Sequence, residues 1–578
     1  MVAGHIVSGE LRARVSAWIA DDPDNGDRAE LSALLADDSE AAAAELTDRF
    51  AGRLEFGTAG LRGAVGAGPN RMNRAIVRAT TAALAGWLTD GDPAAASAGV
   101  VIGCDARNRS DLFADEAARV LAGAGIRVHL LPPRQPTPLL AFAVRQLKAA
   151  AGVMITASHN PPADNGYKLY LSDGAQIVPP ADAEIQAAIS QLGPLSQIRL
   201  ADPSSPLITR HGDEMAQAYL DAVCVISPAP ASAAWLRYVY TPLHGVAGGL
   251  ARRAFSQAGF PAPDVVTAQA EPDPAFPTVA FPNPEEPGAL DLAIELGRRT
   301  SADLVIANDP DGDRLAVAVP EDEARRNWRR LTGDQVGSLL GAYVLSRSAA
   351  GRPAEHDPAR PADPAGELVV STIVSSTLLS RIAAASGAQY AETLTGFKWI
   401  MRAGDTRAGL RFAFGYEEAL GYAVTDVVRD KDGIGAALAL LGLAALARSA
   451  GQSLIDVYDE LEATYGVHAT SQVTITTTRP AGVMAQLRAQ PPAELAGQAV
   501  IAITDLTGGT GELPSADVLT YRLASGRVVI RPSGTEPKIK AYLEIVEHVS
   551  DGQLAIARAR AAGLMDPLRD AVSDLLAG

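Results

Sequence analysis

The chain has 578 residues, of which 47% are hydrophobic, and a formal net charge of −17 at pH 7. This length predicts about four domains of roughly 150 residues each, and the acidic balance makes nucleic acid and anionic membranes poor partners. The two cysteines, Cys104 and Cys224, exclude a disulfide framework and a zinc site built from cysteines.

We expect neither a targeting segment nor a membrane span. The N-terminus has no basic stretch followed by an apolar core, so we expect no signal peptide and a cytoplasmic location. The most apolar run, residues 433–447, has fifteen uncharged residues, fewer than the roughly 20 that a membrane span needs. This run therefore predicts a buried helix.

The first fifty residues predict helices packed on the first domain, because apolar side chains such as Leu11, Val15 and Trp18 recur at helical spacing. A glycine-rich stretch, LEFGTAGLRG at 54–63, follows. Its glycines let the backbone approach a ligand closely, and Arg62 offers a fork of donors to a phosphate. A plain turn with a solvated arginine is the alternative.

A strand, a polar turn and a helix follow one another at residues 99–122, 237–258 and 368–385. This pattern predicts α/β domains with mixed or parallel sheets, which bind ligands at the carboxyl ends of their strands. The last hundred residues instead predict an α+β domain that ends in a helix. We expect the domains to span 1–208, 209–328, 329–466 and 467–578.

The run TASHNP at 156–161 follows an apolar run that predicts a buried strand. The proline- and glycine-containing segment after it predicts a tight polar loop. Ser158 is thus held at a strand end, with Lys168 ten residues further on, which suits a serine that receives and gives up a group. A turn whose Ser and Asn satisfy backbone groups is the alternative.

The run DPDGDR at 309–314 follows another predicted buried strand. Carboxylates at every second position can converge on one hard divalent cation; here they are Asp309, Asp311 and Asp313. An EF-hand would need glycine and glutamate where Arg314 and Pro320 stand, and a haloacid dehalogenase would need Thr or Val at Asp313. Mg²⁺ fits the remaining open site. A solvated acidic turn is the alternative, although clustered carboxylates repel each other without a cation.

Later stretches carry groups that suit sugars and phosphates. Lys398 lies on a glycine-flanked loop, and Glu417 and Glu418 lie between aromatic residues, where they suit sugar hydroxyls. Lys431 lies in a charged turn that adds a cation. A surface lysine, an acidic helix start and a plain charged turn are the alternatives.

The run RPSGTEPKIK at 531–540 predicts a phosphate cradle. Hydroxyls, freed backbone N–H groups and a guanidinium can together surround a phosphate dianion. The members of this cradle are Arg531, Ser533, Gly534, Thr535 and Lys540.

Together these motifs resemble the α-D-phosphohexomutases, the phosphoglucomutase/phosphomannomutase superfamily. Residues 156–161 are similar to its phosphoserine loop, 309–314 to its metal loop, 415–422 to its sugar loop and 531–535 to its phosphate loop. The resemblance implies three related α/β domains and a C-terminal α+β domain, like the TATA-box-binding protein, around a central cleft. It is strongest to the longer branch, which includes phosphoglucomutase-2, phosphopentomutase and bacterial phosphoglucomutases.

The chain departs from the commoner patterns of the family in its sugar and phosphate loops. Glu418 and Gly421 match the sugar motif Gly-Glu-x-Ser-Gly-His, but Tyr422 replaces its histidine and its serine has no clear counterpart. Lys540 stands where many members have arginine.

The resemblance implies a reaction between sugar 1-phosphates and 6-phosphates. Ser158 would pass a phosphoryl group to the sugar and take the other one back from a bisphosphosugar, with glucose 1,6-bisphosphate as activator. Glucose phosphates are the favoured substrates, and mannose or pentose phosphates are the alternatives. We expect a monomer or a homodimer that binds small phosphosugars.

The resemblance also assigns roles to the residues. Ser158 and the three aspartates would hold Mg²⁺, and Arg62 and Arg314 would add positive charge. Lys168, with a pKa lowered by a nearby cation, is the candidate general acid/base, and His159 is its competitor. Lys398, Glu417, Glu418 and Lys431 would bind the sugar, and the cradle would grip the non-reacting phosphate.

Two other kinds of protein remain open at this point. A metal-dependent sugar phosphatase would use the same groups but release inorganic phosphate, and a sensor would bind without turnover. A serine hydrolase pair of Ser158 and His159 is not expected, because adjacent side chains point apart on an extended chain and no Gly-x-Ser-x-Gly elbow occurs.

Overall fold

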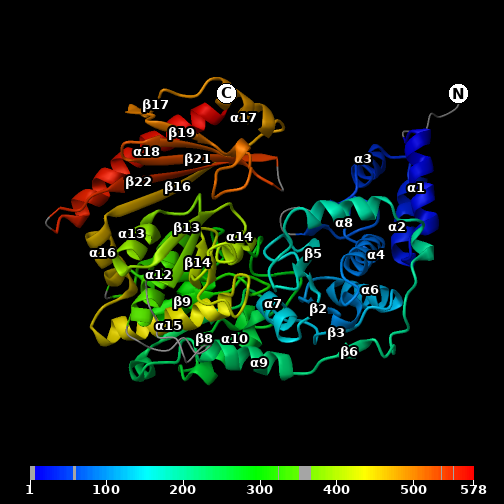
Figure 1. Ribbon diagram of the computed structural model, residues 1–578, viewed down its shortest axis with the longest axis horizontal. Helices are drawn as coiled ribbons and strands as arrows, with labels where there is room; N and C mark the ends of the chain where they lie inside the picture. The colour runs from blue at the N-terminus through cyan, green and yellow to red at the C-terminus, as the bar shows by residue number, and fades with distance from the viewer. Residues whose placement is uncertain are drawn as a thin grey trace.

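The computed structural model describes residues 7–55, 60–322, 324–349, 366–534, 537–550 and 552–577. Within these residues the chain forms four larger sheets in sequence order (Figure 1). In that view the first sheet and its helices lie to the right, and the fourth sheet lies above the second and third. Three α/β units therefore precede an α+β unit, as the sequence predicts.

Three capped helices form the start of the described chain: α1 (Gly9–Asp21), α2 (Asn25–Ala36) and α3 (Glu40–Arg49). Ser8, Asp24 and Ser39 cap their first turns by accepting backbone N–H bonds. Their apolar faces meet in a small separate core. The predicted helical lead-in is confirmed.

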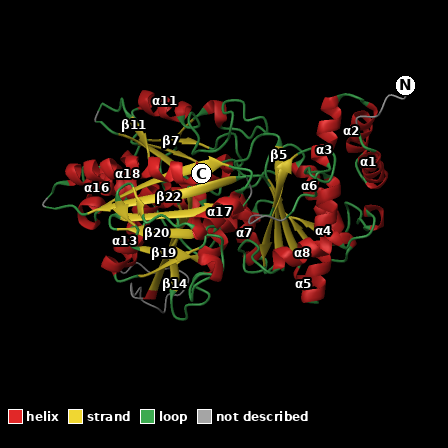
Figure 2. Ribbon diagram, turned by 90° about the horizontal axis from the view of Figure 1, so that it is seen from above, coloured by secondary structure: helices red, strands yellow, loops and turns green. Residues whose placement is uncertain are grey.

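The first sheet has six strands in the order β1-β5-β4-β2-β3-β6, and its two strands β1 and β5 run antiparallel to their neighbours. Its strands are β1 (Leu61–Ala64), β2 (Val100–Cys104), β3 (Val128–Leu130), β4 (Ala151–Ile155), β5 (Asp164–Leu171) and β6 (Ile208–Arg210). Its main helices are α4 (Arg74–Gly91), α6 (Ser110–Gly123), α7 (Thr137–Gln146) and α8 (Ala181–Ser190). Figure 2 shows α7 on one side of the sheet and α4, α6 and α8 on the other.

The second sheet has the order β11-β10-β9-β7-β8. Its strands are β7 (Tyr238–Thr241), β8 (Asp264–Val265), β9 (Leu304–Ala307), β10 (Ala316–Pro320) and β11 (Trp328–Arg330). Its helices are α9 (Glu214–Cys224), α10 (Ala247–Ala258) and α11 (Asp291–Thr300). The central strand β9 is fully buried, and the acidic run 309–314 leaves its carboxyl end.

The third sheet has the order β13-β12-β14-β15. Its strands are β12 (Glu367–Thr372), β13 (Gln389–Thr393), β14 (Arg411–Glu417) and β15 (Gly421–Ala423). Its helices are α12 (Gly333–Ala349), α13 (Leu378–Ser386), α14 (Phe397–Arg402), α15 (Gly433–Ser449) and α16 (Leu454–Tyr465). The three predicted strand-turn-helix units are thus confirmed as β2–α6, β7–α10 and β12–α13.

The fourth sheet is antiparallel, in the order β16-β22-β21-β20-β19. Its strands are β16 (Val467–Thr476), β19 (Ala502–Asp505), β20 (Leu519–Leu523), β21 (Gly526–Pro532) and β22 (Lys538–Glu547). Helices α17 (Pro480–Ala489) and α18 (Leu554–Ala577) accompany it. The described residues of the run 531–540 include the end of β21 and the start of β22, and Lys540 lies in β22 rather than in a loop.

One hydrophobic core joins the second and third units, because β7, β9, β10, α12, β14 and α15 all contribute to it. The predicted buried helix at 433–447 is confirmed as α15. In the described part of the chain, no single helix is long and apolar enough to cross a membrane. Helices α15 and α16 pass that test only as a pair bent by 89°.

Candidate active site

Ser158 is the centre of the site and lies in the loop after β4. Its side chain is buried, and its backbone N–H donates to Thr156 Oγ1 at 2.9 Å. Its φ of 53° is left-handed, a conformation that is uncommon for serine and tends to occur at functional sites. The Oγ donates to Asp309 Oδ2 at 2.8 Å, so the loop of the first unit meets the acidic run of the second.

His159 Nδ1 lies 3.1 Å from Ser158 Oγ. The expectation that these neighbouring side chains point apart is therefore wrong. It assumed extended backbone, whereas the left-handed turn at Ser158 brings the two side chains to the same side. Burial, together with Arg314 and Arg62, holds the pKa of His159 well below its usual value. The imidazole is therefore neutral near pH 7.

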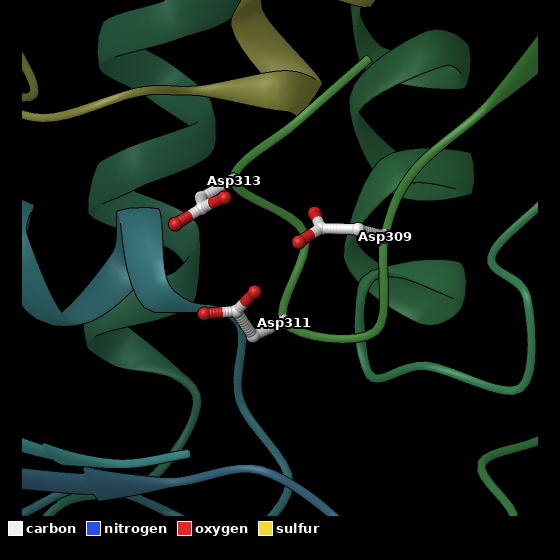
Figure 3. A group of neighbouring side chains, drawn as sticks. All are labelled: Asp309, Asp311 and Asp313. Carbon is white, nitrogen blue, oxygen red and sulfur yellow. The ribbon is translucent and has the colours of Figure 1, made fainter. Parts of the chain in front are cut away.

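The three aspartates of the acidic run point toward one another from the loop after β9 (Figure 3). All are buried, and one oxygen of each lies within 4.8 Å of the others. Burial and repulsion from Asp313 and Asp311 raise the pKa of Asp309 well above its usual value. Burial also raises the pKa of Asp311, but the ammonium of Lys168 outweighs it and the pKa is lowered.

The donor set of this cluster fits a hard divalent cation. Asp311 Oδ1 and Asp313 Oδ1 are buried and have no hydrogen-bond partner. Buried carboxylate oxygens need a partner or a cation, and oxygens are the ligands that Mg²⁺ and Ca²⁺ prefer. The buried aspartate triad beside the hydroxyl of Ser158 thus has the oxygen ligands to hold a divalent cation.

Lys168, on β5, is fully buried against the same aspartates. Its Nζ donates to Asp311 Oδ2 at 2.6 Å and to Asp313 Oδ2 at 2.9 Å. Burial lowers the pKa of Lys168, but the two carboxylates outweigh burial and raise it. The prediction of a lowered pKa for Lys168 is therefore wrong. The sequence does not reveal that two aspartates contact this ammonium.

Other predicted cations surround the cluster. Arg62 Nη1 donates to Asn160 Oδ1 at 3.3 Å in the serine loop, and Arg62 Nε is buried without a hydrogen-bond partner. The Arg314 backbone N–H donates to Asp309 Oδ1 at 2.9 Å. Lys431 Nζ lies 3.2 Å from Asp313 Oδ2, which brings the turn before α15 to the metal loop.

The sugar motif lies at the carboxyl end of β14. Glu417 Oε1 accepts from the Gly396 N–H at 2.6 Å. Lys398, two residues further on, lies in the first turn of α14 and not in the predicted loop, because the helix begins directly after Gly396. Burial raises the pKa of Glu418 to about 7, with Glu417 and Asp334 adding to the shift. Lys398 is also buried, which lowers its pKa.

The described residues of the phosphate motif lie at the end of β21, immediately after it and in β22. Arg531 and Lys540 are paired across the two strands, and the Ser533 N–H donates to Lys538 O at 2.8 Å. Gly534 is exposed, and Thr535 lies outside the described residues.

Tyr542, on β22, links the phosphate motif to the sugar motif. Burial and the charge of Glu418 raise the pKa of Tyr542, and the charge of Arg531 acts in the opposite direction. A cavity of about 360 Å³ lies between Glu418 and Tyr542, with Glu285, Asp334 and Gln472 also in its wall. Residues from the second, third and fourth units thus line one space.

Thr137 is a site residue that sequence reasoning missed. Its Oγ1 donates to Asp311 Oδ2 at 2.5 Å, and its N–H donates to Asp311 O at 2.9 Å. It begins α7, and a threonine at a helix start is ordinary in a sequence. No signal in the chain places it beside the metal loop 174 residues away.

Comparisons with known proteins agree with this geometry. The chain matches the description "Phosphoglucomutase/phosphomannomutase, alpha/beta/alpha" for domain I over residues 53–194, for domain II over 217–322 and for domain III over 332–465. It matches the C-terminal domain of the same description over residues 484–560.

Curated relatives cover most of the chain. A probable phosphomannomutase of Haemophilus influenzae is 42% identical over 82% of this chain and 93% of its own. A phosphopentomutase of Mus musculus is 36% identical over 87% of this chain and 85% of its own. A phosphoglucomutase of Staphylococcus epidermidis is 35% identical over 85% of this chain and 90% of its own.

The crystal structure of a putative phosphomannomutase from Thermus thermophilus superposes with a TM-score of 0.66 at 25% identity, covering 91% of this chain and all of that one. Fold, aspartate triad and relatives together define a metal-dependent phosphosugar mutase. The chain belongs to the phosphoglucomutase/phosphomannomutase family. It is an enzyme that transfers phosphate within its substrate, and the phosphatase alternative is not supported.

Proposed function

We propose that this enzyme interconverts the 1- and 6-phosphates of a sugar, glucose first, with Ser158 as the phosphoryl carrier. The observation that carries the proposal is the 2.8 Å contact between Ser158 Oγ and Asp309, at the edge of the buried aspartate triad. A serine that only ended a strand would not need three carboxylates from another unit beside it.

Mg²⁺ is the proposed cation, held by Asp309, Asp311, Asp313 and an oxygen on Ser158. When bound, it would neutralise charge on the transferring phosphoryl group, which is the main need in this chemistry. Thr137 and Lys168 hold the second oxygen of Asp311, so they orient this carboxylate toward the site.

The proton movements follow from the contacts of Ser158. When Ser158 Oγ bonds to the phosphorus of a bisphosphosugar, the bond from phosphorus to the sugar oxygen breaks. The Oγ proton, which is directed at Asp309 Oδ2 before the reaction, rotates toward His159 Nδ1 and passes to it, because this nitrogen is 3.1 Å away and the imidazole is neutral. The departing sugar oxygen takes a proton from Lys168, which Asp311 and Asp313 keep charged. The reverse steps phosphorylate the sugar.

The remaining predicted residues would hold the substrate in either orientation. Arg62 and Arg314 would offset negative charge at the transferring phosphate. The sugar hydroxyls would contact Lys398, Glu417, Glu418 and Lys431. The non-reacting phosphate would be bound by the cradle at Arg531, Ser533, Gly534, Thr535 and Lys540.

Glucose phosphate is the proposed substrate because the sugar loop resembles that of the longer branch of the family. The relatives carry names for mannose, pentose and glucose, so mannose and pentose phosphates are the second candidates. A bisphosphosugar such as glucose 1,6-bisphosphate would start turnover by phosphorylating Ser158. We also propose the division into domains at 1–208, 209–328, 329–466 and 467–578, and a cytoplasmic location.

Initial rates test this proposal. Glucose 1-phosphate, mannose 1-phosphate and ribose 1-phosphate are compared with Mg²⁺ and a trace of glucose 1,6-bisphosphate. The proposal predicts that the glucose rate is largest and depends on the bisphosphate. A larger mannose or pentose rate would overturn the choice of sugar, and absence of any rate would overturn the mutase function.

A further inference from the structure

Arg107 binds the serine loop through four backbone carbonyls. It lies in the loop between β2 and α6 and is 4% exposed. Its Nη2 donates to Ser158 O at 2.7 Å and to Asn160 O at 2.6 Å. Its Nη1 donates to Pro161 O at 2.7 Å and to Asp164 O at 3.1 Å. One guanidinium thus satisfies acceptors along most of the segment 158–164.

The same guanidinium also contacts the second unit. Its central carbon lies 5.1 Å from the ring centroid of Phe276, which is buried. Phe276 belongs to the segment between β8 and α11. This segment also carries Glu285, whose Oε2 accepts from Arg314 Nη1 of the metal loop at 3.2 Å. Arg107 is therefore placed between the loop of the nucleophile and a segment bound to the metal loop.

These contacts constrain the conformation of Ser158. The left-handed φ of 53° is unfavourable for a serine, so neighbouring contacts must hold it. The bond from Arg107 to Ser158 O fixes the peptide that follows Ser158, and the bond to Asn160 O fixes the peptide two residues further on. With both peptides fixed, Ser158 Oγ is directed at Asp309 Oδ2.

We propose that Arg107 is a positioning residue for phosphoryl transfer. It sets the orientation of Ser158 Oγ relative to the aspartate triad. Phe276 fixes the position of the Arg107 guanidinium relative to the second unit, which carries the triad. This inference rests on the proposed role of Ser158 as phosphoryl carrier.

A lysine cannot replace Arg107 in this role. The four bonds need donors spread over a planar fork, whereas an ammonium offers three donors from one point. Arg107→Lys therefore keeps the charge but cannot form the four hydrogen bonds to the carbonyls at the same time.

The test compares Arg107→Lys with Arg109→Lys in the full-length enzyme. Arg109 lies in the same loop, but its Nη1 pairs with Asp27 Oδ1 at 2.8 Å, away from the serine loop. We expect kcat of Arg107→Lys to fall by roughly 10- to 100-fold with KM little changed, as for a misplaced reacting group. Arg109→Lys should keep the wild-type kcat. Equal kcat values for the two folded variants would overturn the proposal.

Phe276→Leu supplies a second test that does not alter the four hydrogen bonds. We expect a fall in kcat of a few-fold, KM unchanged, and faster hydrolysis of the phosphate on Ser158, measured as inorganic phosphate released without substrate. A merely structural role would lower the midpoint of thermal unfolding without changing kcat of the folded enzyme. If Phe276→Leu kept the wild-type kcat and the wild-type rate of phosphoserine hydrolysis, the proposed role of Phe276 would be overturned.

The outcomes separate this inference from the function on which it rests. An inactive wild-type enzyme would contradict the mutase function itself. An active wild type with an equally active Arg107→Lys variant would contradict only the role of Arg107.

Discussion

Three buried carboxylates with oxygens within 4.8 Å of one another repel each other. Lys168 and Lys431 offset part of this charge, but Asp311 Oδ1 and Asp313 Oδ1 keep no hydrogen-bond partner. At the scale of single residues, the triad therefore should gain stability from a cation.

Mg²⁺ should stabilise the wild-type enzyme, and Asp311→Asn should remove this effect. A ligand at 100 times its dissociation constant adds about 2.7 kcal/mol to the free energy of unfolding, whereas the variant has lost one charged ligand. Thermal unfolding with and without Mg²⁺ measures the difference. Asp213→Asn, whose carboxylate is exposed and pairs with Arg253, is the control that should keep the effect. An equal rise in Asp311→Asn would rule out the triad as the binding site.

Glu418→Gln should change how stability depends on pH. The pKa of Glu418 is raised from 4.5 to about 7 in the folded protein. The contribution of this shift to the free energy of unfolding is therefore fully present below pH 4.5 and is lost as the pH rises through 7. At about 1.4 kcal/mol per pKa unit, the variant should gain up to about 3 kcal/mol over the wild type across that window. Because Glu418 is only half-buried, this is an upper value.

Urea unfolding near the two ends of that window measures this gain. Glu494→Gln, at an exposed position of the fourth unit, is the control and should follow the wild type. Parallel pH profiles for Glu418→Gln and the wild type would show that Glu418 is not held in its neutral form.

At the scale of elements, a buried polar cluster joins the loop after β12 to the fourth sheet. Glu544 on β22 accepts from the Thr377 N–H at 2.7 Å, from Ser376 Oγ at 3.0 Å and from Arg527 Nε at 3.0 Å. His468 Nδ1 lies 3.1 Å from the same carboxylate. We call Ser376, Thr377, His468, Arg527 and Glu544 the clasp, since they join the third and fourth units.

Glu544→Gln should weaken the clasp. Burial raises the pKa of Glu544, but His468, Arg527 and Thr377 outweigh it and lower the pKa to about 2. The stability from this shift is therefore present above pH 4.5 and is lost as the pH falls through 2. At pH 7 the variant should lose about 3 kcal/mol of unfolding free energy.

The loss should shrink as the pH falls below 4.5, where the Glu544 carboxylate of the unfolded chain takes up a proton, and should vanish as the pH falls through 2, where the folded one does. Urea unfolding at several pH values, with Glu494→Gln as the exposed control, measures it. A loss that stayed constant down to the acid limit would mean that the charge of Glu544 does not hold the units together.

At the scale of the whole molecule, the sequence predicts the units better than their meeting points. The units β2–α6, β7–α10 and β12–α13 follow from local signals, namely an apolar run, a polar turn and a helical period. Ser158 and the aspartate triad are likewise visible, because each motif is a short run directly after a buried strand.

Contacts between distant segments are not visible in this way. The bonds from Thr137 to Asp311, from Lys168 to the triad and from Arg107 to the serine loop depend on how separate loops pack. The approach of His159 to Ser158 depends on the left-handed backbone of Ser158. A serine does not predict this conformation, because it is uncommon for serine.

The central claim is that Ser158 carries the phosphoryl group between the two positions of the sugar. The most direct measurement treats the enzyme with glucose 1,6-bisphosphate and Mg²⁺ and locates the phosphate by mass spectrometry of peptides. We expect phosphate on Ser158 that passes to added glucose 1-phosphate, and a folded Ser158→Ala variant with neither phosphate nor turnover. Near-normal turnover in Ser158→Ala would contradict the account.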